Sequence, residues 1–204
     1  MAKMIDKLPE YEGEKKVWEY FSKNLPQQYV VYNNRSIKGW EYDFCVMAEN
    51  VGLFIIEVKG WLPQNIFNVV SEDAIILSGE EQPQASPRKQ ARGYRFNMIN
   101  LLKQELGMNP LVMDLVCYPM ISKNEYLEKR LDVVSDETET IFKEDLEDPA
   151  LLFQKLMGRY NINKSTPHDI LDAKRFALIR HHFEPNFDLK ESEENLNPGY
   201  SSIE

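Results

Sequence analysis

The chain has 204 residues, and 33 aspartates and glutamates against 24 lysines and arginines give it a net charge of −9 near pH 7. Apolar residues make up 43% of it, with only 9 glycines and 11 prolines, so it is neither disordered nor collagen-like and can bury the core of one domain. No apolar run is long enough to cross a bilayer and no secretory signal opens the chain, which predicts a cytoplasmic protein without a membrane partner.

The charge is unevenly distributed along the chain. Residues 125–148 hold ten acids and three bases, whereas residues 87–104 hold five bases and no acid. The acidic balance argues against a protein that simply coats nucleic acid, but the basic stretch is a candidate for local phosphate contacts. Cys45 and Cys117 both lie in apolar runs, which favours buried thiols over a disulfide scaffold.

The first half of the chain predicts a helix followed by strands. Apolar residues at spacings of three and four predict a helix over residues 10–24, which Pro26 ends. Alternating or continuous apolar runs predict strands over residues 28–32, 40–47 and 53–59, and a smaller hairpin from 66–70 and 74–77. Strands joined by tight turns are antiparallel to each other.

The second half predicts a long helix, one more central strand and further helices. Ser86 is the expected N-cap of a helix from Pro87 to Leu106, and a strongly apolar strand follows over 111–121. We expect a short helix over 122–129, a short strand over 131–134, and helices over 149–160 and 167–182. A strand that follows a long helix can run parallel to its neighbour, so the order predicts an α/β fold with a mixed sheet between helices.

Three polar side chains stand out against the apolar strands. Asp43 and Glu57 are equidistant from Asn50 in the predicted turn, so a symmetric hairpin places their Cβ atoms roughly 4.5–5.5 Å apart. Two facing carboxylates repel each other, and Lys59, on the same face as Glu57, offsets only one charge. A divalent cation such as Mg²⁺ would offset the remaining negative charge, and it would also support the hydrolysis of a phosphodiester bond. The alternative for Glu57 and Lys59 is a solvated ion pair at a strand end.

These residues resemble the core of the PD-(D/E)XK nuclease superfamily and, more narrowly, the NERD (nuclease-related) domain. That family has a Gly-Glu pair on its first helix, an aspartate on its second strand, an Ile-Glu-Val-Lys strand end before a tryptophan, and a later helix opening with Pro and Gln-Ala. The matching segments here are Gly13-Glu14, Asp43, Ile56 to Trp61, and Pro87 to Ala91. Tyr42 stands where the superfamily often has proline, and no resemblance is claimed beyond about residue 135.

The resemblance implies a restriction-endonuclease-like core, α-β-β-β-α-β, with extra C-terminal helices. It implies a nuclease domain over residues 1–185, and residues 186–204 are expected to be an acidic tail or linker. The implied activity is Mg²⁺- or Mn²⁺-dependent hydrolysis of DNA, in DNA processing or in defence against foreign DNA. Asp43, Glu57 and the main-chain carbonyl of Val58 would hold the metal, Lys59 would be the catalytic lysine, and Glu14 and Gln90 would complete the site.

Several of these roles have plainer alternatives. Glu14 is also a first-turn acid that the helix dipole favours, and Gln90 is also a candidate surface residue. The expected nucleic-acid contacts are the basic residues around Gln90, namely Arg88, Lys89, Arg92 and Arg95. Their alternative is a solvated helix face.

The expected partner is DNA, with a helicase domain in cis or in trans as a further expectation from the family. A rival interpretation is a non-catalytic module that binds DNA or a partner with the same fold, and the net charge of −9 favours it. A third is a nuclease acting on RNA or branched DNA. The sequence leaves monomer and dimer open.

Overall fold

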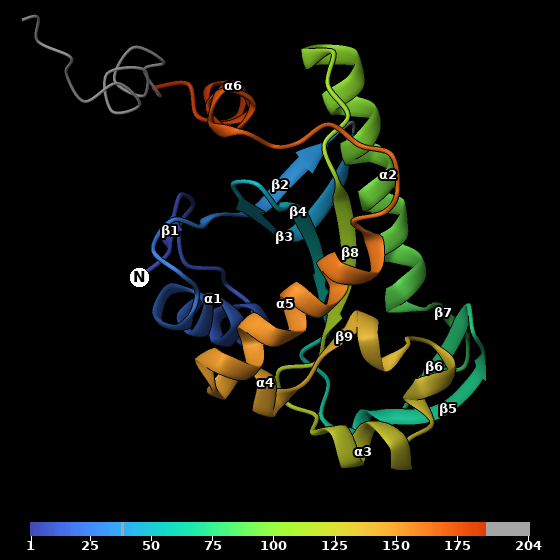
Figure 1. Ribbon diagram of the computed structural model, residues 1–204. Coiled ribbons are helices and arrows are strands. Elements are labelled where there is room, and N and C mark those ends of the chain that lie inside the picture. Colours follow the sequence, from blue (N-terminus) through green and yellow to red (C-terminus); the bar gives the residue numbers. More distant parts are fainter. Residues whose placement is uncertain (38, 187–204) are drawn as a thin grey trace, which may run out of the picture.

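A computed structural model describes residues 1–37 and 39–186 of the chain (Figure 1). The predicted tail, apart from its first residue, lies outside the described residues. The centre of the molecule is a six-stranded mixed sheet with strand order β1-β2-β3-β4-β8-β9. Its strands are β1 Lys3–Met4, β2 Val30–Ile37, β3 Trp40–Ala48, β4 Gly52–Val58, β8 Val112–Cys117 and β9 Thr140–Ile141.

The direction of the strands follows from their connections. β2, β3 and β4 are antiparallel neighbours joined by short turns, whereas β8 returns after a long helix and pairs parallel to β4. The predicted mixed sheet is therefore confirmed, and the arrangement is a nuclease-like α/β fold.

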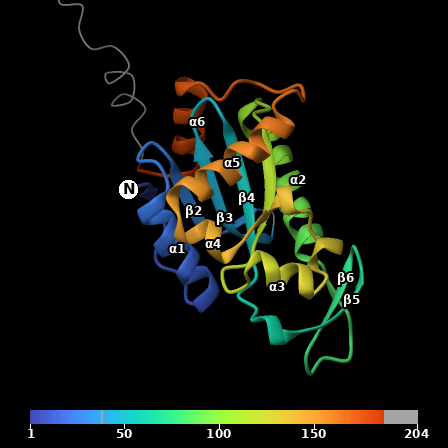
Figure 2. The same cartoon turned by 60° about the horizontal axis from the view of Figure 1, so that its bottom comes forward.

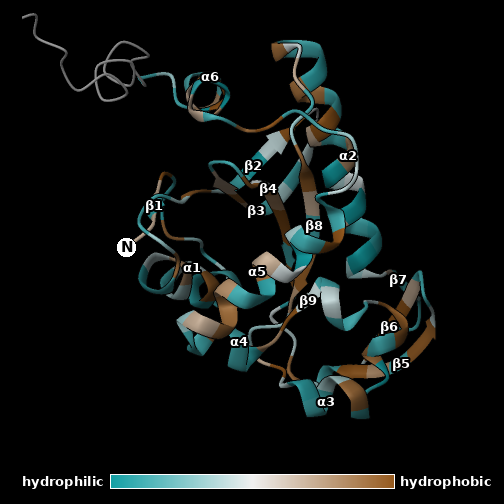
Figure 3. Cartoon of the chain, in the orientation of Figure 1, coloured by the Kyte–Doolittle hydropathy of each residue, from teal (hydrophilic) through white to brown (hydrophobic). Residues whose placement is uncertain are grey.

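Helices cover both faces of this sheet (Figures 1 and 3). Helices α1 Glu12–Asn24, α4 Lys143–Glu147 and α5 Pro149–Asn163 pack on the face that carries Phe54 and Ile56. Helices α2 Pro87–Leu106 and α6 Ala173–Phe183 pack on the face that carries Leu53 and Ile55. Because successive side chains of a strand point to opposite faces, the apolar run of β4 fills two cores at once.

A second, three-stranded sheet extends from the end of β4, away from the main sheet (Figure 2). It consists of β5 Ile66–Ser71, β6 Ala74–Leu77 and β7 Gln84–Ala85, after the 3₁₀ turn η1 Pro63–Asn65. Ile66 and Ile75 join it to a third apolar cluster, which includes Tyr126 of α3 Lys123–Glu128. The predicted small hairpin is confirmed, and the structure adds β7 to it as a third strand.

Helix α2 has the predicted bounds, and Ser86 Oγ accepts a hydrogen bond from the Lys89 amide (3.3 Å) as its N-cap. Two predictions for the chain after residue 130 are wrong. The short strand expected over 131–134 is the 3₁₀ turn η2 Leu131–Val133. The helix expected over 167–182 begins only at Ala173, because the Asp169 amide pairs with Asn109 and Asp172 supplies the N-cap.

The strand predicted over 111–121 is shorter, ending at Cys117. The sequence also gave no signal for β9, for α4, or for the 3₁₀ turn η3 Glu137–Glu139. No helix among the described residues is both long and apolar enough to cross a membrane.

Candidate active site

Asp43 and Glu57 lie at the point where the β3–β4 hairpin opens. The ladder is symmetric about Asn50 as predicted, since Cys45 pairs with Ile55 and Phe44 with Ile56, the last pair of the ladder. One step beyond it, a carboxylate oxygen of Asp43 accepts a hydrogen bond from the Val58 amide (2.7 Å). The side chain of Asp43 thus takes the place of a backbone partner and is held at the end of β4, beside Glu57.

Both carboxyl groups are harder to ionise than in water, and burial is the main cause. Burial and then the charge of Glu57 raise the pKa of Asp43 to about 8, although the Val58 amide opposes this rise. Burial also raises the pKa of Glu57, against the effect of Lys59. The pair therefore carries less negative charge near neutral pH than two ordinary carboxylates.

Glu57 is 3% exposed and has one satisfied and one unsatisfied oxygen. Its Oε1 lies 2.6 Å from Lys59 Nζ, whereas its Oε2 is buried without a hydrogen-bond partner. Lys59 is itself largely covered and lies 5.8 Å from the centre of the Trp61 ring. A buried carboxylate oxygen without a partner is costly, so this atom is a ready ligand for a cation.

Glu14 reaches the site because α1 packs directly on the end of β4. A Cβ on Gly13 would lie 2.6 Å from Gly60 Cα, so two glycines allow the two backbones to touch. Asn34 donates a hydrogen bond to Glu14 (2.8 Å), and the charge of Glu14 contributes to the raised pKa of both Asp43 and Glu57. The Gly-Glu pair thus combines a packing residue with an acid at the site.

Gln90 and Tyr94 come from one flank of α2. With 3.6 residues per turn, Gln90, Tyr94 and Asn97 follow one another along the side of the helix next to the buried line of Ala91, Met98 and Leu102. Tyr94 packs edge-on against Trp40 of β3, with ring centres 6.3 Å apart. Burial, with Glu57 and Asp43 next, raises the pKa of Tyr94 to about 12, so its hydroxyl keeps its proton near the carboxylates. The Oε1 atom of Gln90 is buried without a partner.

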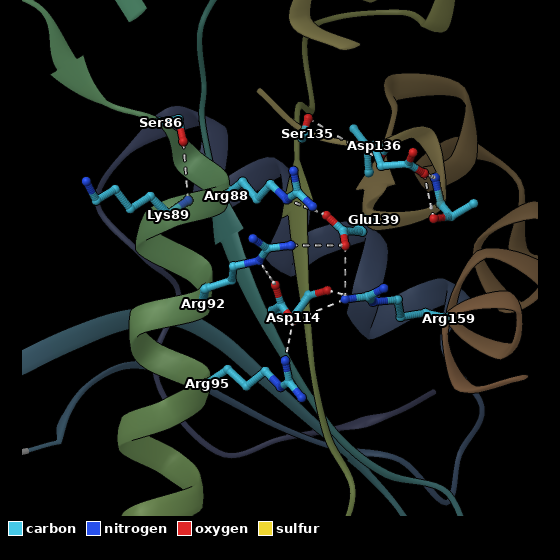
Figure 4. Close-up of polar contacts among 12 residues, drawn as sticks. Ser86, Arg88, Lys89, Arg92, Arg95, Asp114, Ser135, Asp136, Glu139 and Arg159 are labelled. Carbon is cyan, nitrogen blue, oxygen red and sulfur yellow. Dashed lines mark hydrogen bonds and ion pairs between the residues drawn. The ribbon is translucent and has the colours of Figure 1, made fainter. Parts of the chain in front are cut away.

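Three of the four predicted nucleic-acid contacts lie on the other flank of α2 (Figure 4). Arg88 lies 2.9 Å from a carboxylate oxygen of Glu139, and Arg95 lies 3.5 Å from one of Asp114. Arg92 lies between the same two acids, at 3.9 Å from Asp114 and 3.8 Å from Glu139. We call Arg88, Arg92, Arg95, Arg159, Asp114 and Glu139 the arginine network.

The arginine network also lies along the edge of β8 that faces away from β4. The carbonyls of Leu111 and Cys117 accept hydrogen bonds from the backbone of Leu53 and Lys59, so they point toward β4. The carbonyls of Val112 and Asp114 instead accept bonds from Arg95 (2.8 Å) and Arg159 (3.0 Å). Arginine side chains therefore satisfy backbone groups that β9, which pairs only with Val116 and Cys117, is too short to reach.

Lys89 differs from these arginines. It is exposed, points away from the arginine network, and forms no ion pair within the described part of the chain (Figure 4). Of the four basic residues, it is the one whose charge is fully presented to solvent.

The residues fit a hard divalent cation with few protein ligands. No group of three or more His, Cys, Asp and Glu side chains forms a metal site among residues 1–37 and 39–186. Mg²⁺ commonly binds through one or two carboxylates and retains water or phosphate oxygens as its other ligands. Asp43 and Glu57, with the carbonyl of Val58 nearby in sequence, match that ligand set. The Glu57 oxygen without a hydrogen-bond partner is available as a ligand.

Sequence reasoning missed Asn34 and the two acids of the arginine network. Asn34, which holds Glu14, has a backbone φ of 51° inside β2, and its only sequence signal was an Asn-Asn pair. Asp114 and Glu139 gave no signal, because their partners come from distant segments.

The family comparison agrees with this geometry. The family model described as the nuclease-related domain, NERD, matches residues 9–119, more than half of the chain and all of the residues around Asp43 and Glu57. Searches of the curated proteins and of the solved structures found no match.

Proposed function

Because this chain belongs to the NERD nuclease-related family, we propose that it is a metal-dependent nuclease that hydrolyses phosphodiester bonds of DNA. The observation that carries the proposal is the pair Asp43 and Glu57, held together in a poorly solvated site with Lys59 on one side and an unpaired carboxylate oxygen on the other. Perturbed carboxyl groups next to a lysine are typical of catalytic rather than structural positions.

In this proposal each residue has a defined task. Asp43, Glu57 and the Val58 carbonyl would hold Mg²⁺ or Mn²⁺, and the ion would supply a lowered pKa of a water molecule and stabilisation of charge on the phosphate. Lys59 positions the attacking water or neutralises the negative charge that develops at phosphorus. The water oxygen bonds to phosphorus as it loses a proton, the bond to the leaving sugar oxygen breaks, and that oxygen takes up a proton.

The flanking residues complete the proposed site. Glu14, held by Asn34, and Gln90, with a buried oxygen that lacks a partner, are placed to orient the water or the substrate. The expected setting is DNA processing or defence against foreign DNA in the cytoplasm, with a helicase as a candidate partner.

A cleavage assay tests this proposal. The substrates are single-stranded, linear duplex and supercoiled DNA and RNA, each with Mg²⁺, Mn²⁺ or EDTA. We expect metal-dependent cutting of DNA that falls by about 100-fold or more in Asp43→Asn and in Lys59→Ala, the scale of losing one charge-stabilising group. Lys103→Ala, at an exposed lysine in the last turn of α2, is the matched control and retains activity.

The second candidate function is a binding module without catalysis. It is favoured by the net charge of −9 and by the acidic partners that engage Arg88, Arg92 and Arg95. No cutting by a folded wild-type protein that also binds no Mn²⁺ would leave this alternative in place of the nuclease.

A further inference from the structure

A pocket opens beside the candidate site, between the segment that precedes α1 and the middle of β2. Residues 5–11 form one wall, and Asn33, Asn34 and Arg35 form the other. Its volume is about 630 Å³, within the range of about 300–1,000 Å³ that is usual for pockets that hold small ligands.

Asn34 forms a wall that the pocket shares with the candidate site. It lines the pocket, and its side chain donates a hydrogen bond to Glu14 (2.8 Å). The β2–β3 ladder keeps one register on both sides of Asn34, which places Asn34 across from Asp43 on the neighbouring strand. Neighbouring strands are about 4.8 Å apart, so a nucleic-acid strand bound at Asp43 can place an adjacent nucleotide at the pocket.

A buried hydrogen-bond acceptor at the pocket lacks a partner. Asn33 lines the pocket and is only 3% exposed. Its amide nitrogen donates to the carbonyl of Lys7 (3.0 Å) and to Asn34 Oδ1 (2.9 Å), whereas its own Oδ1 accepts no hydrogen bond from the described part of the chain. The two donated bonds fix the orientation of the amide. The unpaired oxygen therefore requires a donor, which a ligand in the pocket can supply.

The charges that line the pocket disfavour a phosphate. Three acids and two bases line it, namely Asp6, Glu10, Glu41, Lys7 and Arg35. One of the bases, Arg35, already donates two hydrogen bonds of 2.8 Å to Asp6 and one to the carbonyl of Phe183. A ligand that carries hydrogen-bond donors and no negative charge suits this lining better than a phosphate does.

An exposed aromatic ring lies where the pocket opens to solvent. Tyr11, the residue before α1, lines the pocket and is 73% exposed. Aromatic rings next to a nucleic-acid strand stack on unpaired bases, whatever the sequence, because every base has a flat face. The pocket thus combines a stacking surface with a buried acceptor.

We propose that this pocket binds an unpaired nucleobase of the substrate strand. The base stacks on Tyr11 and donates a hydrogen bond from its Watson–Crick edge to Asn33 Oδ1, while the phosphates stay outside the acidic lining. In a duplex that edge is already paired, so the pocket selects single strands or frayed ends. The inference rests on the proposed nuclease function and adds how the substrate strand is chosen.

The test compares two single DNA strands of equal length, one with all of its bases and one in which every nucleotide is abasic. Both carry the same phosphates, so the ratio of their affinities measures the contribution of the bases. Affinities are measured in EDTA for the wild type and for Tyr11→Ala, Tyr11→Trp and Asn33→Leu, and thermal midpoints report folding. Phe67→Ala is the matched control, because Phe67 is 72% exposed but lies in β5 of the second sheet.

We expect the wild type to bind the strand with bases about tenfold or more tightly than the abasic strand, the scale of stacking one base. Tyr11→Ala and Asn33→Leu should lower this ratio by about fivefold or more, whereas Tyr11→Trp and Phe67→Ala keep it. Asn33→Leu also removes two hydrogen bonds and can lower the thermal midpoint. Tyr11→Ala changes an exposed side chain, so it tests the pocket in a folded protein.

The outcomes separate this inference from the proposed function. A wild-type protein that cuts DNA but binds both strands equally, or a base preference that Tyr11→Ala leaves unchanged, overturns the pocket alone. A base preference that Tyr11→Ala removes, in a protein that does not cut with Mg²⁺ or Mn²⁺, supports the pocket and overturns the nuclease activity. A folded wild-type protein that neither binds nor cuts nucleic acid overturns both.

Discussion

The buried carboxyl group of Asp43 lowers the stability of the fold near neutral pH. Its pKa of about 8 lies above the ordinary value of 3.8, so the folded protein binds more protons than the unfolded chain between these values. The free energy of unfolding therefore falls as the pH rises from about 4 to 8 without metal, and the loss is complete above that range.

Asp43→Asn removes this penalty and keeps an oxygen to accept the bond from the Val58 amide. In EDTA we expect the variant to melt several degrees above the wild type at pH 8–9 and close to it at pH 4, because one kcal/mol corresponds to about 2–4 °C in a domain of this size. Calorimetric melting across this pH range measures the difference. A midpoint difference that stays constant with pH would contradict the assignment of the raised pKa to Asp43.

Gly13 is a second single residue on which the structure depends, because it allows α1 to pack closely against Gly60. A methyl group there would lie 2.6 Å from Gly60 Cα, and backbone atoms cannot move aside cheaply. Gly13→Ala should cost about 1–3 kcal/mol and shift Glu14 away from the carboxylate pair. Thermal melting measures the loss. Gly158→Ala is the control that gains stability, because Gly158 lies in the interior of α5 with nothing within 4 Å of an added Cβ. An unchanged melting temperature would mean that α1 does not rest on Gly60.

Helix α2 shows, at the scale of an element, how two flanks can have different roles. One flank brings Gln90 and Tyr94 toward the site, and the other places three arginines on acids of β8 and η3. The sequence predicted the helix and its cap because these are local properties. It could not separate the flanks by role, because Asp114 and Glu139 come from segments that only the fold brings near.

The difference between local properties and contacts of distant segments also explains which other predictions from the sequence succeeded. The register of Asp43 and Glu57 was predictable because a short hairpin determines it locally. β9 and the late start of α6 were not, since a two-residue strand and an extended segment held by Asn109 depend on partners distant in sequence. Asn34 was missed for the same reason.

The arginine network, which joins α2 and α5 to β8 and η3, gives a prediction at the scale of the structural elements. Arg159 is nearly buried and contacts Asp114 at 3.1 Å and Glu139 at 3.4 Å, so Arg159→Met leaves buried carboxylate charge less compensated. We expect a loss of about 3 kcal/mol, measured by denaturant unfolding. Arg175→Met, which breaks an exposed pair with Asp172, should cost less than about 1 kcal/mol. If both variants lost the same free energy of unfolding, Arg159 would contribute no more to stability than an exposed surface ion pair.

At the scale of the whole molecule, the family-matched region shares its core with the segment that follows it. It ends at residue 119, yet α1 and the sheet share one apolar cluster with Ile141, Leu146, Leu152 and Leu156 from the segment that follows. Removal of that segment would expose one face of the sheet to water.

A chain of residues 1–119 should therefore fail to fold cooperatively, whereas a chain of residues 1–186 should melt in one sharp transition. Circular dichroism with limited proteolysis distinguishes the two. A protease-resistant, cooperatively melting 1–119 fragment would show that the C-terminal helices are an addition to an autonomous core.

The arginine side chains on the carbonyls of Val112 and Asp114 have a consequence for how copies of this protein meet. A sheet edge with free carbonyls is a template on which a strand from another molecule can add, and such additions lead to aggregates. Here guanidinium groups occupy that template and surround it with positive charge. Simultaneous loss of Arg95 and Arg159 would leave the carbonyls of Val112 and Asp114 open to such an addition.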